Sequence, residues 1–147
     1  MFGISDFYSY CKQNQVDVIP FMGCPQPGAT IRDQGHYAVF LDFSKIRSTR
    51  LLRGVCYHEL GHAATGALHK IDSPYELVER SEYRANRWAA EHFLTEADFR
   101  EAFSWGYTEP WQLAEYFELP EEDIKKALTY WTERKGIDFH KKQTCLL

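Results

Sequence analysis

The sequence predicts a single α+β domain. Its candidate strands all lie before residue 44, whereas the apolar residues after that point recur at helical spacing. The chain has 147 residues, enough for one compact domain, and its 44% apolar and 26% charged residues are typical of globular proteins. We therefore expect residues 1–147 to form one domain, in which a small sheet is followed by helices.

Three short strands are expected in the first part of the chain, after a helix over residues 3–14. The candidate strands are residues 16–19, 29–32 and 36–43. The last of them, HYAVFLDF, is rich in β-forming residues. Because only residues 44–48 tie this strand to the next helix, we expect Tyr37–Asp42 to run along a cleft with one edge unpaired.

Two long helices are predicted next. The first covers residues 49–68, where apolar residues follow helical spacing. The second has Ser73 as its N-cap, Pro74 as its first helical residue and Glu76 closing a capping box, and it ends near Leu94. Shorter helices then follow: one started by the Thr95–Asp98 capping box, and two over residues 109–117 and 120–134. The tail, residues 138–147, is expected to fray.

The sequence HELGH at residues 58–62 lies inside the first long helix. Residues four apart share one face of a helix, so the imidazoles of His58 and His62 can reach one metal ion. Glu59 is offset around the helix, beside the ion and not bound to it, where it can take a proton from water. The pattern therefore predicts a catalytic zinc site with Glu59 as its base. The alternative is a solvated helix face that carries two histidines.

A third ligand is expected on the second helix. A short turn near Ile71 joins the two helices, and residues equally far from the turn of an antiparallel pair face each other. Residue 60 then faces Glu82, while Glu79, one turn nearer the loop, remains the alternative. Ala85 would permit the close helix approach that a shared ion requires. Two His and one Glu leave a fourth position for water, as in catalytic zinc sites.

Two segments, YHELGHAATGALH and SEYRANRWAAEHFLTEADF, together resemble the ImmA/IrrE family of metallopeptidases. The pattern of that family is HELGH followed by a Glu three residues before Ala-Asn, and the similarity extends from about residue 16 to residue 131. One difference is Trp88, where the family more often has Phe. The resemblance implies a zincin-like core with a C-terminal helical cap.

The resemblance also implies the roles of individual residues. His58, His62 and Glu82 would hold one zinc ion per chain, and Glu59 would be the catalytic base. The implied activity is an endopeptidase of narrow specificity, whose substrate is commonly a helix-turn-helix transcriptional repressor or a similar regulatory protein. The alternative is a non-hydrolytic partner of a regulator, in which the metal only braces the fold.

Charge and composition narrow the choice of partners and compartment. Residues 108–131 resemble a helix-turn-helix but carry six acidic and two basic residues, whereas DNA readers need positive charge. We expect this segment to be a cap that packs on the core or on a protein, with no direct contact to nucleic acid.

No apolar run approaches the roughly 20 residues of a membrane helix. A cytoplasmic protein of bacterial or phage origin is expected, because no secretory signal and no CxxC pair is seen.

Overall fold

The computed structural model describes residues 2–69 and 72–141 and confirms the α+β fold class. The strands are β1 (Asp17–Pro20), β2 (Gly28–Asp33) and β3 (His36–Leu41). The helices are α1 (Ile4–Gln13), α2 (Thr49–Thr65), α3 (Tyr75–Phe93), α4 (Glu96–Ser104), α5 (Pro110–Phe117) and α6 (Glu121–Thr129), followed by a π-helical turn, η1 (Tyr130–Arg134). Strands thus end before residue 44 and helices make up the rest, as the sequence predicts.

The three strands form one mixed sheet in the order β1-β3-β2. β3 pairs in parallel with β1 and antiparallel with β2, so both of its edges are occupied. The expectation that residues 37–42 form an edge strand is therefore wrong. The physical reason is that β3 is the most apolar strand, with Val39 and Leu41 fully buried, and the centre of the sheet is where such a strand is best shielded.

The edge that remains free beside the helices belongs to β2. A two-residue turn with positive φ at Gln34 (50°) and Gly35 (81°) joins β2 to β3, which makes Asp33 and His36 a hydrogen-bonded pair. Hydrogen-bonded pairs occur at every second position along an antiparallel ladder. The amide of Asp42 donates to the carbonyl of Pro27, and this pair falls an even number of positions from Asp33 and His36, as the alternation requires. The main-chain groups of residues 28, 30 and 32 consequently face away from β3. Within the described ranges no strand pairs with them.

Helix α2 begins and ends with defined caps. The Ser48 hydroxyl accepts a hydrogen bond from the Leu51 amide at 3.0 Å, as an N-cap does. The helix ends at Thr65, three residues earlier than predicted, because Gly66 adopts a left-handed conformation (φ 66°) and its amide bonds back to the His62 carbonyl. The apolar pattern of Ala67 and Leu68 therefore continues beyond the helix.

Of the next two helices, one begins a residue away from its predicted start and the other begins with the predicted cap. Helix α3 has Pro74 as its N-cap and Tyr75 as its first residue, so the predicted start with Ser73 as the cap is wrong by one position. Proline's fixed φ suits either place, whereas its extended ψ of 146° puts it outside the helix. The Thr95–Asp98 capping box at the start of α4 is confirmed.

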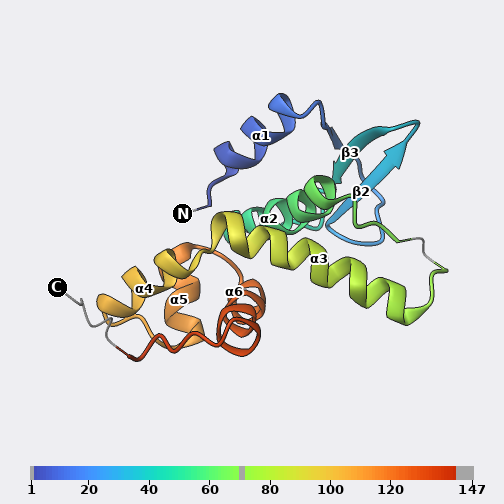
Figure 1. Ribbon diagram of the computed structural model, residues 1–147. Coiled ribbons are helices and arrows are strands. Elements are labelled where there is room, and N and C mark those ends of the chain that lie inside the picture. Colours follow the sequence, from blue (N-terminus) through green and yellow to red (C-terminus); the bar gives the residue numbers. More distant parts are fainter. Residues whose placement is uncertain (1, 70–71, 142–147) are drawn as a thin grey trace.

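Helices α2 and α3 form the centre of the molecule, with the sheet on one side and α4–α6 on the other (Figure 1). The two helices pack so closely at Gly61 that a Cβ there would lie 2.3 Å from the Ala85 carbonyl oxygen. Two turns before Gly61, on nearly the same face of α2, Gly54 lies directly against Asp123 of α6 and against Pro120, the N-cap of that helix. Glycines on one face of α2 therefore let α3 and α6 come close to the helix that carries the HELGH motif.

The C-terminal segment is better packed than expected. Phe139 is 7% exposed, and its ring contacts those of Phe99 and Phe103 with centroids 5.6 and 5.3 Å apart. The prediction that residues 138–147 fray is wrong for this aromatic anchor, while residues 142–147 lie outside the described part.

In the described ranges, none of the helices combines the length and apolarity that crossing a membrane requires. Cys11, Cys24 and Cys56 are free and buried, and Cys145 lies outside the described residues.

Candidate metal centre

His58 and His62 lie one turn apart on the same face of α2. Their Nε2 atoms are 3.2 Å apart, and the rings meet edge to face with centroids 4.8 Å apart. His62 is 5% exposed, and the His58 side chain is 25% exposed. The helical spacing of the motif therefore brings both ring nitrogens to one point, at the border between the core and solvent.

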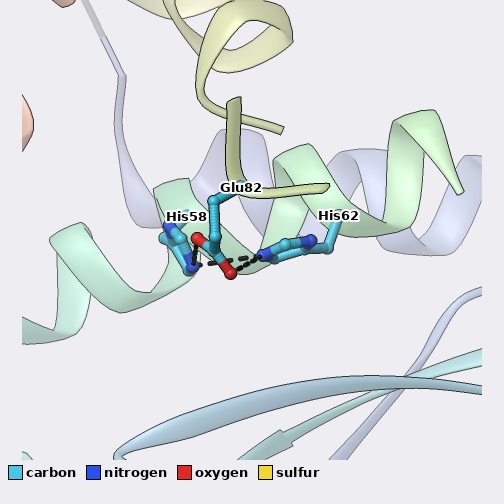
Figure 2. A group of neighbouring side chains, drawn as sticks. All are labelled: His58, His62 and Glu82. Atoms are coloured by element: carbon cyan, nitrogen blue, oxygen red, sulfur yellow. Dashed lines mark hydrogen bonds and ion pairs between the residues drawn. The ribbon is translucent and has the colours of Figure 1, made fainter. Parts of the chain in front are cut away.

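Glu82 reaches this point from α3. One of its oxygens, Oε2, lies 3.2 Å from His58 Nε2, and the other, Oε1, lies 3.2 Å from His62 Nε2. Figure 2 shows the carboxylate pointing down from α3 between the two imidazoles. Glu79 is exposed and accepts a hydrogen bond from the Tyr75 hydroxyl. Of the two glutamates that the hairpin argument left open, the structure brings Glu82 to the pair.

The three donor groups fit a tetrahedral metal ion. Zinc bonds of about 2.0–2.1 Å at tetrahedral angles require donor atoms roughly 3.3 Å from one another. Here the two Nε2 atoms lie 3.2 Å apart, and each lies 3.2 Å from a different oxygen of Glu82. With one donor atom taken from each residue, the three atoms lie within 4.8 Å of one another. Within the described residues, this is the one group of three His, Cys, Asp or Glu side chains with such proximity. Two imidazoles and one carboxylate would hold the ion and leave a fourth position for water.

The second ring nitrogen of His62 has a fixed role. Nδ1 lies 2.6 Å from the Ala67 carbonyl oxygen, which can only accept, so Nδ1 carries the proton. The Ser81 hydroxyl donates to the same carbonyl at 2.6 Å and holds it in place. In the neutral ring the lone pair is therefore on Nε2, the nitrogen that faces Glu82, as a metal ligand requires.

The protonation of Glu82 and His58 reflects their closeness. Burial alone would raise the pKa of Glu82, but the hydrogen bonds and charges of His58 and His62 outweigh it and hold the pKa far below its usual range. Burial would lower the pKa of His58, and the hydrogen bond to Glu82 with the charges of Glu59, Glu82 and Asp123 raises it instead. The site is thus strongly anionic around its imidazoles, which favours a cation at this point.

Glu59 lies beside the cluster and is buried, with 6% of its surface exposed. Its Oε2 accepts a hydrogen bond of 2.5 Å from the hydroxyl of Thr30 on β2. Sequence analysis did not find Thr30, because a single threonine in a strand has no local signature and the contact spans 29 residues. The contact between Thr30 and Glu59 becomes visible only in the structure, where β2 packs against α2.

The comparisons with known proteins agree with this geometry. Residues 37–129 match the family model described as the IrrE N-terminal-like domain, Peptidase_M78. The chain belongs to this family. The Peptidase_M78 match runs from β3 to α6 and includes His58, Glu59, His62 and Glu82, and the family indicates a metallopeptidase that acts on protein. Thr30 lies before the matched region. No curated protein and no solved structure gave a match.

Proposed function

We propose that this chain is a zinc-dependent endopeptidase of narrow specificity. The observation that carries the proposal is the cluster of His58, His62 and Glu82 next to a buried glutamate. In it the two Nε2 atoms lie 3.2 Å apart, and each lies 3.2 Å from an oxygen of Glu82. In this proposal His58, His62 and Glu82 are the ligands of one ion per chain, and Glu59 is the catalytic base. A protein that only binds a regulator has no need of a buried acid at residue 59.

In the proposed hydrolysis, Glu59 transfers the proton and the three ligand residues hold the metal ion. When bound, zinc polarises the peptide carbonyl and lowers the pKa of water to about 7. Glu59 takes the proton from the attacking water and later gives it to the leaving amine, so it holds the proton only between the two steps. His58, His62 and Glu82 keep the reacting groups beside Glu59.

The free edge of β2 is the proposed seat of the substrate backbone. The main-chain groups of residues 28, 30 and 32 face outward, and the side chain of Thr30 on the same strand touches Glu59. A peptide added here as a strand would gain main-chain hydrogen bonds without being read for sequence. This edge replaces β3, which the sequence analysis favoured.

A helix-turn-helix repressor or similar regulator is the proposed substrate. The resemblance to ImmA/IrrE proteins supports this choice, and so does the charge of the cap over residues 108–131. Its acidic residues Glu109, Glu115, Glu118, Glu121 and Glu122 are exposed. A DNA-binding protein presents a positively charged surface to the phosphates of DNA. That surface is complementary in charge to the acidic cap. A cytoplasmic location and a bacterial or phage origin belong to the same proposal.

The test uses a peptide library that spans helix-turn-helix regulators, incubated with the zinc-loaded chain and read by mass spectrometry. We expect cleavage at a few defined bonds, and none after zinc is removed with a chelator. The library should remain intact with the His58→Ala variant. Cleavage that continues without metal would exclude the proposed mechanism.

A further inference from the structure

The Thr30 hydroxyl is the hydrogen-bonding partner of the Glu59 carboxylate. Its Oγ1 lies 2.5 Å from Glu59 Oε2 and 3.2 Å from the Glu59 carbonyl oxygen. Within the described ranges no other hydrogen bond to this carboxylate occurs, although Glu59 is only 6% exposed. The position of the acid group therefore depends on one side chain of β2.

The backbone of β2 confines Glu59 on a second side. A Cβ on Gly28 would stand 3.1 Å from Glu59 Cγ, 3.5 Å from its Oε1 and 2.5 Å from Val55 Cγ1. Glycine thus lets the strand lie directly on α2 at the residue that carries the acid. Because residues 28 and 30 alternate with 29, both face α2 from the same side of the sheet.

We infer that Thr30 is a positioning residue that fixes the Glu59 carboxylate and links it to the strand edge where substrate is held. The inference rests on the proposed function, in which Glu59 moves the proton and the outward main chain of β2 receives the peptide. A hydrogen bond to Oε2 leaves Oε1 free for proton transfer. The same residue then sets the distance between the bound peptide and the acid group.

The hydroxyl can serve both charge states of Glu59. When the carboxylate is ionised, Thr30 donates its single hydrogen to Oε2. When Glu59 holds the proton on Oε1, Oε2 remains an acceptor and the Thr30 hydroxyl still donates to it. The contact therefore persists through the proton transfers.

The first test separates catalysis from binding. Thr30→Val keeps the shape of the side chain and removes the hydroxyl, and Thr30→Ser keeps the hydroxyl. With a library peptide that the wild type cleaves, we expect Thr30→Val to lower kcat roughly 10- to 100-fold, as loss of such a supporting hydrogen bond typically does. KM and zinc affinity should stay within about twofold, and Thr30→Ser should restore most of kcat. Thr132→Val, which removes a hydroxyl bonded to Leu128 far from the site, is the control.

The second test needs no substrate and no metal. Urea unfolding of the metal-free protein is compared for Thr30→Val in the wild-type and Glu59→Ala backgrounds. We expect Thr30→Val to lower the unfolding midpoint in the first background and to change it little in the second. Equal shifts in both backgrounds would show that the two side chains are not coupled and would overturn the inference. If the valine variant does not fold, Thr30→Ala enters the same comparison.

The outcomes distinguish this inference from the proposed function. If Glu59→Gln cleaves the peptide normally, the proposed function fails, while the unfolding comparison still decides whether Thr30 holds Glu59. If Glu59→Gln is inactive and Thr30→Val retains wild-type kcat, only the role of Thr30 is wrong. A serine variant as slow as the valine variant would also overturn it, because the hydroxyl would then not be the group that matters.

Discussion

The carbonyl oxygen of Ala85 occupies the place where a side chain on Gly61 would stand, 2.3 Å from an ideal Cβ. Helices α2 and α3 therefore touch backbone to backbone at this crossing. Glu82 lies almost one turn before Ala85 on α3, and its carboxylate thereby reaches both His58 and His62 at 3.2 Å. The geometry of the proposed metal site depends on a glycine that binds nothing itself.

Gly61→Ala should therefore weaken metal binding. Alanine is the better helix former by about 1 kcal/mol, but its methyl group must push α3 away, and such overpacking costs about 1–3 kcal/mol. We expect at least a tenfold loss of zinc affinity in a chelator competition, with no gain in stability. A variant that is more stable than the wild type and binds zinc equally well would show that the crossing does not set the site.

Glu82→Ala should lower zinc affinity by at least 100-fold, because it removes one of the three proposed ligands. Glu79→Ala is the matched control, since it deletes an exposed carboxylate one turn away on the same helix. We expect its affinity to stay within about twofold of the wild type. Competition with a fluorescent chelator measures both. Equal losses for the two variants would mean that overall charge, and not ligation by Glu82, holds the ion.

Arg32→Pro tests whether the free edge of β2 holds substrate, as proposed. The amide of Arg32 faces away from β3, so proline there removes a hydrogen-bond donor without breaking the ladder. We expect KM for a cleaved peptide to rise about fivefold to tenfold, as for the loss of one hydrogen bond of about 1 kcal/mol. Arg32→Ala removes the side chain and keeps the amide, so it should leave the main-chain contribution intact. If the two variants behave alike, the peptide does not use this amide.

Asp123 gives the stability of the metal-free protein a specific pH dependence. Burial beside α2 raises the pKa of Asp123 to about 6, despite the attraction of His58 and Lys126. The folded state therefore binds this proton more tightly than the unfolded chain, and stability decreases as the pH rises from about 4 to about 6. Asp123→Asn should stabilise the protein by about 1–2 kcal/mol at pH 7.5, with little or no gain near pH 4.

Urea unfolding at several pH values measures this effect. Glu122→Gln, which removes an exposed charge from the neighbouring position of α6, is the control and should change stability by less than about 0.5 kcal/mol at every pH. A stabilisation by Asp123→Asn that is the same at pH 4 and pH 7.5 would contradict the assignment of a raised pKa.

The sequence predicts what depends on short-range spacing. Four-residue spacing placed His58 and His62 on one face of α2, and the symmetry of a helical hairpin led to Glu82. Strand order depends instead on pairing between residues far apart in the chain, such as Val18 with Val39, and no local pattern reports it. Thr30 escaped notice for the same reason. Gly66 is a residue type typical of helix C-caps and could have indicated that α2 ends there. The apolar residues after it, however, continued the helical spacing and favoured a longer helix.

The measurement that tests the central claim most directly compares the wild type with Glu59→Gln for zinc content and for cleavage of the regulator-derived peptide library. The substitution keeps the shape of the side chain and removes the group that exchanges the proton. We predict one zinc ion per chain in both proteins, with cleavage at defined bonds by the wild type and at least a 1000-fold slower reaction by the variant. A Glu59→Gln variant that holds zinc and cleaves the same bonds at the wild-type rate would contradict the account.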